Sequence, residues 1–240
     1  MEGKMPIVSH FSEMRRRILY SVIAIGIITV IAFVYWHQIF EFLIAPAPDD
    51  IRLQSIEVME GLSNIFKVCF TTGLIFSMPF LVYQLFAFLS PALKFSEKRY
   101  IFVSLPIITL LFIGGVAFAY YVALPPALGF LFTFGSDVLD VAPRITSYID
   151  VITRMLVAVG ISFETPLILM VLAKIGVVNS QWLASKRKIW LIVAFVLAAI
   201  ITPTFDPINQ TIIALPLIVL YEVSIWLTKL VRRKPKQEPA

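Results

Sequence analysis

The segment ILYSVIAIGIITVIAFVYW, residues 18–36, holds no charged residue and directly follows Arg15-Arg16-Arg17. An α-helix rises ~1.5 Å per residue, so about 20 apolar residues cross the ~30 Å hydrocarbon core of a bilayer. The apolar part of a cleaved signal peptide is shorter, at roughly 7–15 residues. The sequence therefore predicts an uncleaved transmembrane helix over residues 18–36.

The composition of the whole chain also indicates a membrane protein. Of its 240 residues, 59% are apolar and 15% are charged, whereas about 25% are charged in soluble domains. We therefore expect one transmembrane domain over residues 1–240. The net charge of +5 comes from short basic clusters without interleaved aromatic residues, a pattern that argues against nucleic acid as a partner. The only cysteine, Cys69, lies in an apolar run and has no second cysteine for an internal disulfide.

The apolar runs predict an all-α polytopic membrane protein with six transmembrane helices. The predicted spans are residues 18–36, 62–88, 100–124, 147–175, 189–201 and 208–227. We expect the long connections, 37–61 and 125–146, to form structured caps with short interfacial helices such as Ile39–Ile44. The connection Thr202–Pro207 is so short that the last two spans must form a hairpin. At ~1.5 Å per residue, residues 189–201 reach only about 20 Å, so we expect the bilayer to be thinner there.

The positions of the basic residues predict the orientation, because cytoplasmic loops carry an excess of Lys and Arg. One side of the six spans receives most of the basic residues, namely Lys4, Arg15–Arg17, Lys94, Lys98, Arg99, Lys174, Lys186–Lys188, Lys229, Arg232–Lys234 and Lys236. The other side receives mainly Asp and Glu. We therefore expect both termini in the cytoplasm, with a basic cytoplasmic tail over residues 229–240.

Glu164 is the deepest ionisable residue of the predicted spans. Arg154 and Lys174 lie ten residues before and after it, or about 15 Å along a helix, so the carboxyl group belongs near the bilayer midplane. A carboxylate there costs roughly 2.5–3.5 kcal/mol, and such residues usually face a cavity or a partner. The alternative is a packing anchor, hydrogen bonded to Gln210 or Thr211. Pro166 predicts a kink beside Glu164, because proline leaves a carbonyl near Ser162 without its usual donor.

Two further carboxylates lie among basic residues at the predicted cytoplasmic face. Glu13 precedes Arg17 by four residues, and such a pair can form on one helix face. Glu97 stands in a Lys-Phe-Ser-Glu-Lys-Arg sequence over residues 94–99. Helix opening explains Ser96. Acidic groups among basic ones add nothing to topology, so Glu13 and Glu97 are candidates for binding a basic ligand.

Enzymatic motifs do not occur in the sequence. It has no HExxH, no glycine-rich phosphate loop and no GxSxG. Neither His10 nor His37 is deep in a span, and only one carboxylate is, which disfavours an intramembrane protease. No residue cluster has metal-ligand spacing, and we expect no cofactor.

Motifs along most of the chain resemble TatC, the core receptor subunit of the twin-arginine protein translocase. The matching residues are His10-Phe11-x-Glu13-Met14-Arg15-x-Arg17, Ala45-Pro46, Phe88-x-x-Pro91-Ala92-Leu93, Glu97-x-Arg99, Gly115-x-Ala117-Phe118-Ala119-Tyr120, Ser162-Phe163-Glu164-x-Pro166, and Thr202-Pro203 with Asp206 and Gln210. Members of the family often have Leu where Met14 stands.

The resemblance implies a receptor for signal peptides that carry an Arg-Arg pair on folded cargo. It implies a binding site made of Glu13 and Glu97 with Phe88, Pro91 and Leu93, in which Arg15 and Arg17 orient the acids. It implies that Glu164, with Pro166 and Gln210, receives a polar residue of a partner span. It assigns Pro46, Pro203 and Asp206 to structural loops.

The resemblance further implies partners of the single-span TatA and TatB types, an oligomeric complex in a prokaryotic inner membrane or an equivalent organelle membrane, and transport driven by the proton-motive force. The alternative function is a proton- or ion-coupled small-molecule transporter that uses Glu164. The absence of an internal repeat in the sequence argues against that alternative.

Overall fold

The computed structural model describes residues 7–48, 53–89, 95–134, 143–204 and 206–230. Within these ranges, the side chains of residues 7–10, 89, 95–104, 175 and 230 are not described. Pro91 and Leu93 lie outside the described residues, and so does most of the basic tail.

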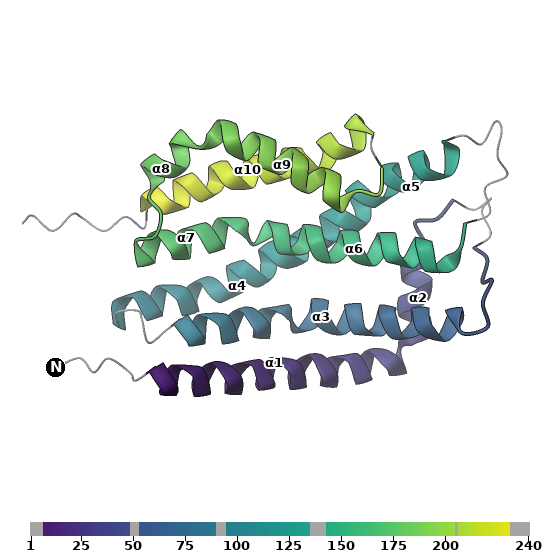
Figure 1. Ribbon diagram of the computed structural model, residues 1–240, viewed down its shortest axis with the longest axis horizontal. Coiled ribbons are helices and arrows are strands. Elements are labelled where there is room, and N and C mark those ends of the chain that lie inside the picture. Colours follow the sequence, from purple (N-terminus) through teal and green to yellow (C-terminus); the bar gives the residue numbers. More distant parts are fainter. Residues whose placement is uncertain (1–6, 49–52, 90–94, 135–142, 205, 231–240) are drawn as a thin grey trace, which may run out of the picture. The chain divides into compact units, whose positions relative to one another are not determined.

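The described residues are almost entirely helical, as the sequence predicts (Figure 1). The helices are α1 (Ile7–Val34), α2 (Trp36–Ile44), α3 (Glu60–Leu89), α4 (Phe95–Phe118), a π-helical turn (Ala119–Ala123), α5 (Leu124–Thr133), α6 (Ile145–Phe163), α7 (Thr165–Ile175), α8 (Ser180–Ser185), α9 (Arg187–Ile201) and α10 (Pro207–Leu230). Their lengths and apolar faces make the chain an all-α polytopic membrane protein.

Among the described residues, five helical segments are long and apolar enough to cross a membrane. They are Phe11–Val34, Glu60–Phe88, Leu105–Thr133, Ile145–Lys174 and Pro207–Lys229. The predicted fifth span corresponds to α9, whose 15 residues extend about 22 Å. The count of six spans and the orientation of the termini remain predictions.

The connection predicted at residues 125–146 begins as a helix instead. Helix α4 continues through the π-helical turn into α5, so the helical segment ends at Thr133 and is longer than the predicted span 100–124. Pro125 and Pro126 lie in the first turn of α5. Proline has no backbone N–H, but the π-helical turn before α5 does not require one at these positions. The short helix predicted at Ile39–Ile44 is confirmed by α2, which begins at Trp36, and its place at the membrane interface stays a prediction.

The chain forms two compact units, and the first comprises Met1–Thr109 with Leu139–Thr153. In this unit, α1 packs along the length of α3 (Figure 1). Gly73 permits this approach, because a Cβ atom there would overlap the hydroxyl and backbone of Thr29. The α1–α3 pair thus depends on a glycine at one level of α3.

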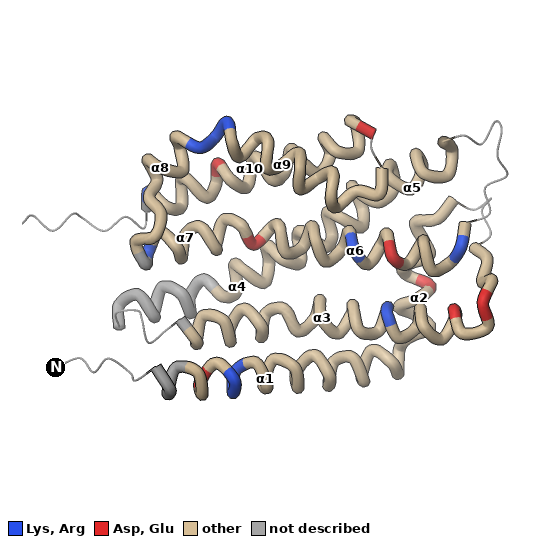
Figure 2. Tube along the Cα trace, in the orientation of Figure 1, with Lys and Arg blue, Asp and Glu red and all other residues tan. Residues whose placement is uncertain are grey.

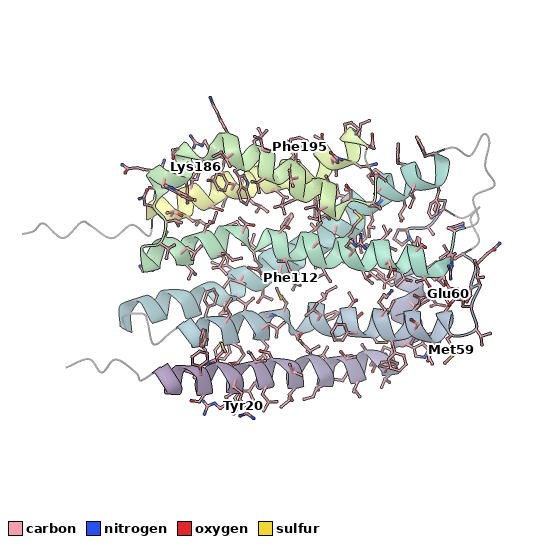
Figure 3. The ribbon with its side chains drawn as sticks, in the orientation of Figure 1. Tyr20, Met59, Glu60, Phe112, Lys186 and Phe195 are labelled. Atoms are coloured by element: carbon pink, nitrogen blue, oxygen red, sulfur yellow. The ribbon has the colours of Figure 1, made fainter. Side chains whose placement is uncertain are left out.

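Glu60, the first residue of α3, contacts both the connection before α3 and the start of α6. Glu60 is 5% exposed, and its carboxylate accepts hydrogen bonds from the backbone N–H of Ile56 at 2.7 Å and from the Thr146 hydroxyl at 2.5 Å. Arg144 Nε lies 3.6 Å from the same carboxylate. Figure 3 shows Glu60 and its neighbour Met59 where α3 begins. The connection before α3 is therefore tied to the start of α6.

Further polar contacts continue this link along α3 and α6. The Asn64 side-chain amide donates to the Thr146 hydroxyl at 3.0 Å, and Lys67 forms an ion pair with Asp150. Glu60, Asn64 and Lys67 are spaced by four and three residues, so they occupy one face of α3. That face is the one that meets α6 in this unit.

Tyr148 of α6 caps the end of α2. Its hydroxyl donates to the carbonyl of Leu43 at 3.1 Å and lies 3.2 Å from the carbonyl of Ile44. The last carbonyls of a helix have no partner within it, and Pro46, two residues after α2, provides no N–H. The buried Tyr148 side chain supplies the missing donor.

The second unit comprises Leu110–Val138 and Arg154–Ala240. Helix α10 packs against α7, α8 and α9. The Trp190 ring stacks on Tyr221 at 4.5 Å between centroids, and the Tyr221 hydroxyl donates to the Leu183 carbonyl at 2.8 Å. Gly160 of α6 lies against α4, since a Cβ atom there would come within 2.9 Å of Phe112.

The short connection between α9 and α10 forms the predicted hairpin. The Thr202 hydroxyl donates to the Ala198 carbonyl at 2.8 Å at the end of α9. Asp206 opens α10, because its carboxylate accepts from the Asn209 N–H at 3.0 Å, which is the usual capping arrangement. Pro207 then occupies the first helical position, where no N–H is required.

Replacing Tyr148 by Phe removes the capping hydroxyl and keeps the ring. We expect Tyr148→Phe to lower the free energy of unfolding by about 0.5–1.5 kcal/mol, the usual value of one hydrogen bond. Reversible unfolding of the purified protein in mixed micelles measures this change. Tyr35→Phe is the matched control, because Tyr35 is exposed, and it should change the free energy by less than about 0.5 kcal/mol. Equal effects of the two variants would contradict the capping role.

Candidate functional site

Glu13 of α1 is held by Arg17 one turn further along the same helix. Arg17 Nη2 and Nε lie 2.6 and 3.1 Å from Glu13 Oε1. Arg17 Nη1 donates to Gln84 Oε1 of α3 at 3.2 Å, and Gln84 is 7% exposed. The guanidinium therefore links a half-buried carboxylate on α1 to a buried amide on α3.

Arg17 contacts only one of the two oxygens of Glu13. Both contacts with Arg17 use Oε1, and no hydrogen bond to Oε2 occurs within the described part of the chain. The Glu13 side chain is about one-fifth exposed. Because a carboxylate can accept bonds on both oxygens, this group can bind a second cation while Arg17 holds its orientation.

The other residues predicted for this site are described to different extents. The Arg15 side chain is exposed, and Phe88, near the end of α3, is half-buried. Glu97 lies in the first turn of α4, but its side chain is outside the described residues, as are Pro91 and Leu93. Residues 90–94 are all that separate α3 from α4, so the chain connects the Gln84 end of α3 to the helix turn that carries Glu97.

Glu164 is a buried carboxyl group without a partner in the described structure. It is 3% exposed, and neither carboxyl oxygen has a hydrogen-bond partner among the residues that the structure describes. The predicted alternative, an anchor to Gln210 or Thr211, is not formed. The Thr211 hydroxyl instead donates to the Pro207 carbonyl, and the Gln210 backbone N–H donates to the Asp206 carbonyl.

The helix is interrupted at Glu164, as Pro166 predicts. Helix α6 ends at Phe163 and α7 begins at Thr165. Pro166 cannot donate to the carbonyl of Ser162, and the Thr165 hydroxyl takes its place at 2.6 Å. A membrane helix tolerates proline where a side chain supplies the missing donor in this way. The break leaves the carboxyl group beside a short non-helical turn.

Unpaired buried carboxyl groups are unfavourable, so Glu164 requires either a proton or a ligand. An ionised carboxylate without donors costs far more in an apolar site than a protonated one. A protonated carboxyl group can both donate and accept, which suits it to a polar side chain on an apolar helix.

The predicted loop residues lie next to helix ends. Pro46 follows the end of α2 that Tyr148 caps, and Asp206 caps α10. Pro203 lies in the connection between α9 and α10. Among the described residues, no group of three His, Cys, Asp or Glu side chains could hold a metal ion.

Comparison with known proteins identifies the family. The family model for the Sec-independent protein translocase protein (TatC) matches residues 9–216. The chain belongs to the TatC family.

Relatives in that family match over nearly the full chain. TatC of Aquifex aeolicus is 39% identical over 97% of this chain and 98% of its own length, and TatC of Carboxydothermus hydrogenoformans is 35% identical over 99% and 98%. Two crystal structures of the twin-arginine translocase receptor TatC match with TM-scores of 0.79 and 0.81, each at 38% identity. They cover 93% and 91% of this chain and 100% and 99% of their own. This chain is therefore a multi-pass membrane component of a Sec-independent protein translocase.

Three polar residues that make important contacts in this structure were not identified from the sequence. Gln84 is buried against α1, and its only signal in the sequence is an amide within an apolar run. Glu60 and Thr146 belong to segments predicted as loops, and their contact joins residues far apart in the sequence. A polar residue at the predicted end of a span is the only pattern that could have indicated them.

The free energy of unfolding of two variants tests whether the Glu164 carboxyl group is hydrogen bonded. Because its oxygens have no partner in the described structure, Glu164→Leu should leave the free energy of unfolding unchanged or raise it by up to about 2 kcal/mol. Asn64→Leu is the matched contrast, since Asn64 is equally buried but bonded to Thr146, and it should lower that energy by about 1–3 kcal/mol. Unfolding in mixed micelles measures both. A loss for Glu164→Leu as large as for Asn64→Leu would show that Glu164 is a bonded anchor.

Proposed function

We propose that this chain is the receptor and core subunit of a twin-arginine translocase, which binds Arg-Arg signal peptides of folded proteins. The observation that carries the proposal is the Glu13–Arg17–Gln84 arrangement. It keeps one carboxylate oxygen oriented and leaves the other for a guest cation. Family membership and the receptor named in the titles of the two solved structures support the same function.

The carboxylates of the proposed site favour a ligand with guanidinium groups. A guanidinium group forms paired, charge-assisted hydrogen bonds with a carboxylate, whereas a lysine ammonium binds as a point charge. We propose that Glu13 and Glu97 each receive one guanidinium, and that Phe88, Pro91 and Leu93 line the path of the peptide. Arg17 orients Glu13, and Arg15 contributes to the local balance of charge.

Glu164 has a separate role in this proposal. Its carboxyl group, beside the break at Pro166, receives a polar side chain from a single-span partner of the TatA or TatB type, with Gln210 contributing on α10. The unpartnered oxygens of Glu164 support this assignment. The partner supplies the bonds that the described residues of the chain do not.

The remaining parts of the proposal follow the family. The protein acts without catalysis, and the proton-motive force drives export by an oligomeric complex. It lies in the inner membrane of a prokaryote or an equivalent organelle membrane, with six spans and both termini in the cytoplasm. The alternative of a small-molecule transporter that uses Glu164 is not favoured, because the relatives are named as protein translocase components.

Titration with a synthetic Arg-Arg signal peptide tests the receptor site. We expect Glu13→Ala and Glu97→Ala each to weaken binding by about 10–100-fold, the value of a charge-assisted hydrogen bond. Gln84→Leu should weaken peptide binding less, because Arg17 then loses its acceptor on α3 but the Glu13 carboxylate remains. A Lys-Lys peptide should bind wild-type protein weakly. Glu57→Ala is the control for loss of an exposed carboxylate. Unchanged binding in both the Glu13 and Glu97 variants would refute the site.

Export of a reporter in cells tests the role of Glu164. We expect Glu164→Ala to reduce export at least tenfold while the purified variant binds signal peptide normally, because the partner span loses its polar contact. The exposed acid Glu41 provides the control variant Glu41→Ala, which should export at the wild-type rate. Export by Glu164→Ala at the wild-type rate would reduce Glu164 to a packing residue.

A further inference from the structure

One end of the second unit carries a concentration of basic residues that the proposed signal-peptide site does not use. Helices α7 and α10 end there with Lys174 and Lys229 in their last turns, and α9 begins there with Lys186, Arg187 and Lys188 at its start. Figure 2 shows these basic segments at the same end of the unit, and Figure 3 labels Lys186 between α8 and α9. We call this set the basic end.

Within this set, Arg187 forms an ion pair with a carboxylate of the same unit. Arg187 Nε and Nη2 lie 2.6 and 2.8 Å from the two oxygens of Glu222, which ties the start of α9 to α10. No ion pair joins Lys186, Lys188 or Lys229 to a carboxylate within the described ranges. The pair with Glu222 therefore links the start of α9 to α10, while Lys186, Lys188 and Lys229 have no carboxylate partner within the described ranges.

Lys188 and Lys229 lie at the ends of exposed apolar faces of α9 and α10. On α9, Lys188 continues a stripe of exposed apolar residues at intervals of four, Ile192, Val196 and Ile200. Such residues lie on one face of a helix. In a multi-pass membrane protein, an exposed apolar stripe faces acyl chains, so a cation at its end lies at the level of the lipid headgroups.

Helix α10 repeats this arrangement with an added indole. Leu215, Val219 and Trp226 are exposed along it, and Lys229 follows with its ammonium group 5.8 Å from the centre of the Trp226 ring. Trp182 of α8 is also half exposed at the same end. Tryptophan is enriched at the membrane interface, where its ring contacts both headgroups and chains.

We propose that the basic end binds the headgroup phosphate of an acidic phospholipid, with its acyl chains along the exposed stripes of α9 and α10. The charges favour an anionic headgroup over a zwitterionic one, because the three lysines have no carboxylate in the described structure to balance them. Lys186 and Lys188 contact the phosphate at the start of α9, and Lys229 with Trp226 holds a headgroup at the end of α10. The bound lipid stabilises the short α9–α10 hairpin at the membrane surface.

Titration of the full chain in detergent, read by native mass spectrometry, tests the proposal. The probes are phosphatidylglycerol and phosphatidylcholine with the same acyl chains. We expect wild-type protein to prefer phosphatidylglycerol. The double variant Lys186→Gln/Lys188→Gln should reduce that preference by about 25-fold, or roughly fivefold for each lysine. Lys186→Arg/Lys188→Arg retains the charge and should retain the preference, which separates loss of the site from loss of folding.

A matched control removes two basic residues elsewhere. Arg15→Gln/Arg16→Gln takes two charges from the exposed cluster on α1 and should leave the preference for phosphatidylglycerol within about twofold of wild type. Equal affinity of wild-type protein for the two lipids would overturn the proposal. An equal loss in the α1 control would also overturn it, because binding would then reflect net charge alone.

Fluorescence quenching locates the lipid. In nanodiscs of phosphatidylcholine, a minor fraction of phosphatidylglycerol with brominated chains should quench tryptophan more than brominated phosphatidylcholine does. Trp182→Phe/Trp226→Phe should remove that excess quenching, whereas Trp36→Phe on α2 should not. Excess quenching that survives the double variant would place the lipid elsewhere and contradict the assignment.

Discussion

A backbone amide in the hydrocarbon of a bilayer has no water to bond, and the described structure depends on this constraint wherever a helix ends or bends. At several of these points a side chain replaces the missing partner. Thr165 bonds the carbonyl that Pro166 leaves free, Tyr148 caps the end of α2, and Asp206 caps the start of α10. These residues lie in different parts of the sequence, yet each supplies a side-chain hydrogen bond to a backbone group that lacks a partner within its helix.

The constraint also distinguishes two buried acids. Glu60 receives donors from its own connection and from Thr146, so its charge is balanced within the fold. Glu164 is as deeply buried, but neither oxygen has a donor in the described structure. A fold that satisfies Glu60 so completely leaves Glu164 without bonds at a helix break, which is the expected arrangement for a group that meets a partner or a proton.

Arginine residues connect helices in both units and leave other charges available. Arg17 divides its donors between Glu13 and Gln84, which orients a carboxylate without using both of its oxygens. Arg187 uses both oxygens of Glu222 and leaves the adjacent lysines unbalanced. In one case the available charge is negative and suits a guanidinium, and in the other it is positive and suits a phosphate. The geometry of arginine, with several donors in one plane, makes both arrangements possible.

The sequence by itself determined the helical class, the approximate positions of the long helices, the kink at Pro166, the short hairpin and the family, because apolar runs, prolines and ordered motifs are local patterns. It also indicated Glu13 and Glu164, since a carboxyl group in an apolar or basic setting is visible without a fold. Only the tertiary structure decided that Gln84 holds Arg17 and that Glu60 bonds Thr146. It also decided that Glu164 has no bond to Gln210. Those facts depend on which helix faces meet, and packing between segments far apart in the chain sets them.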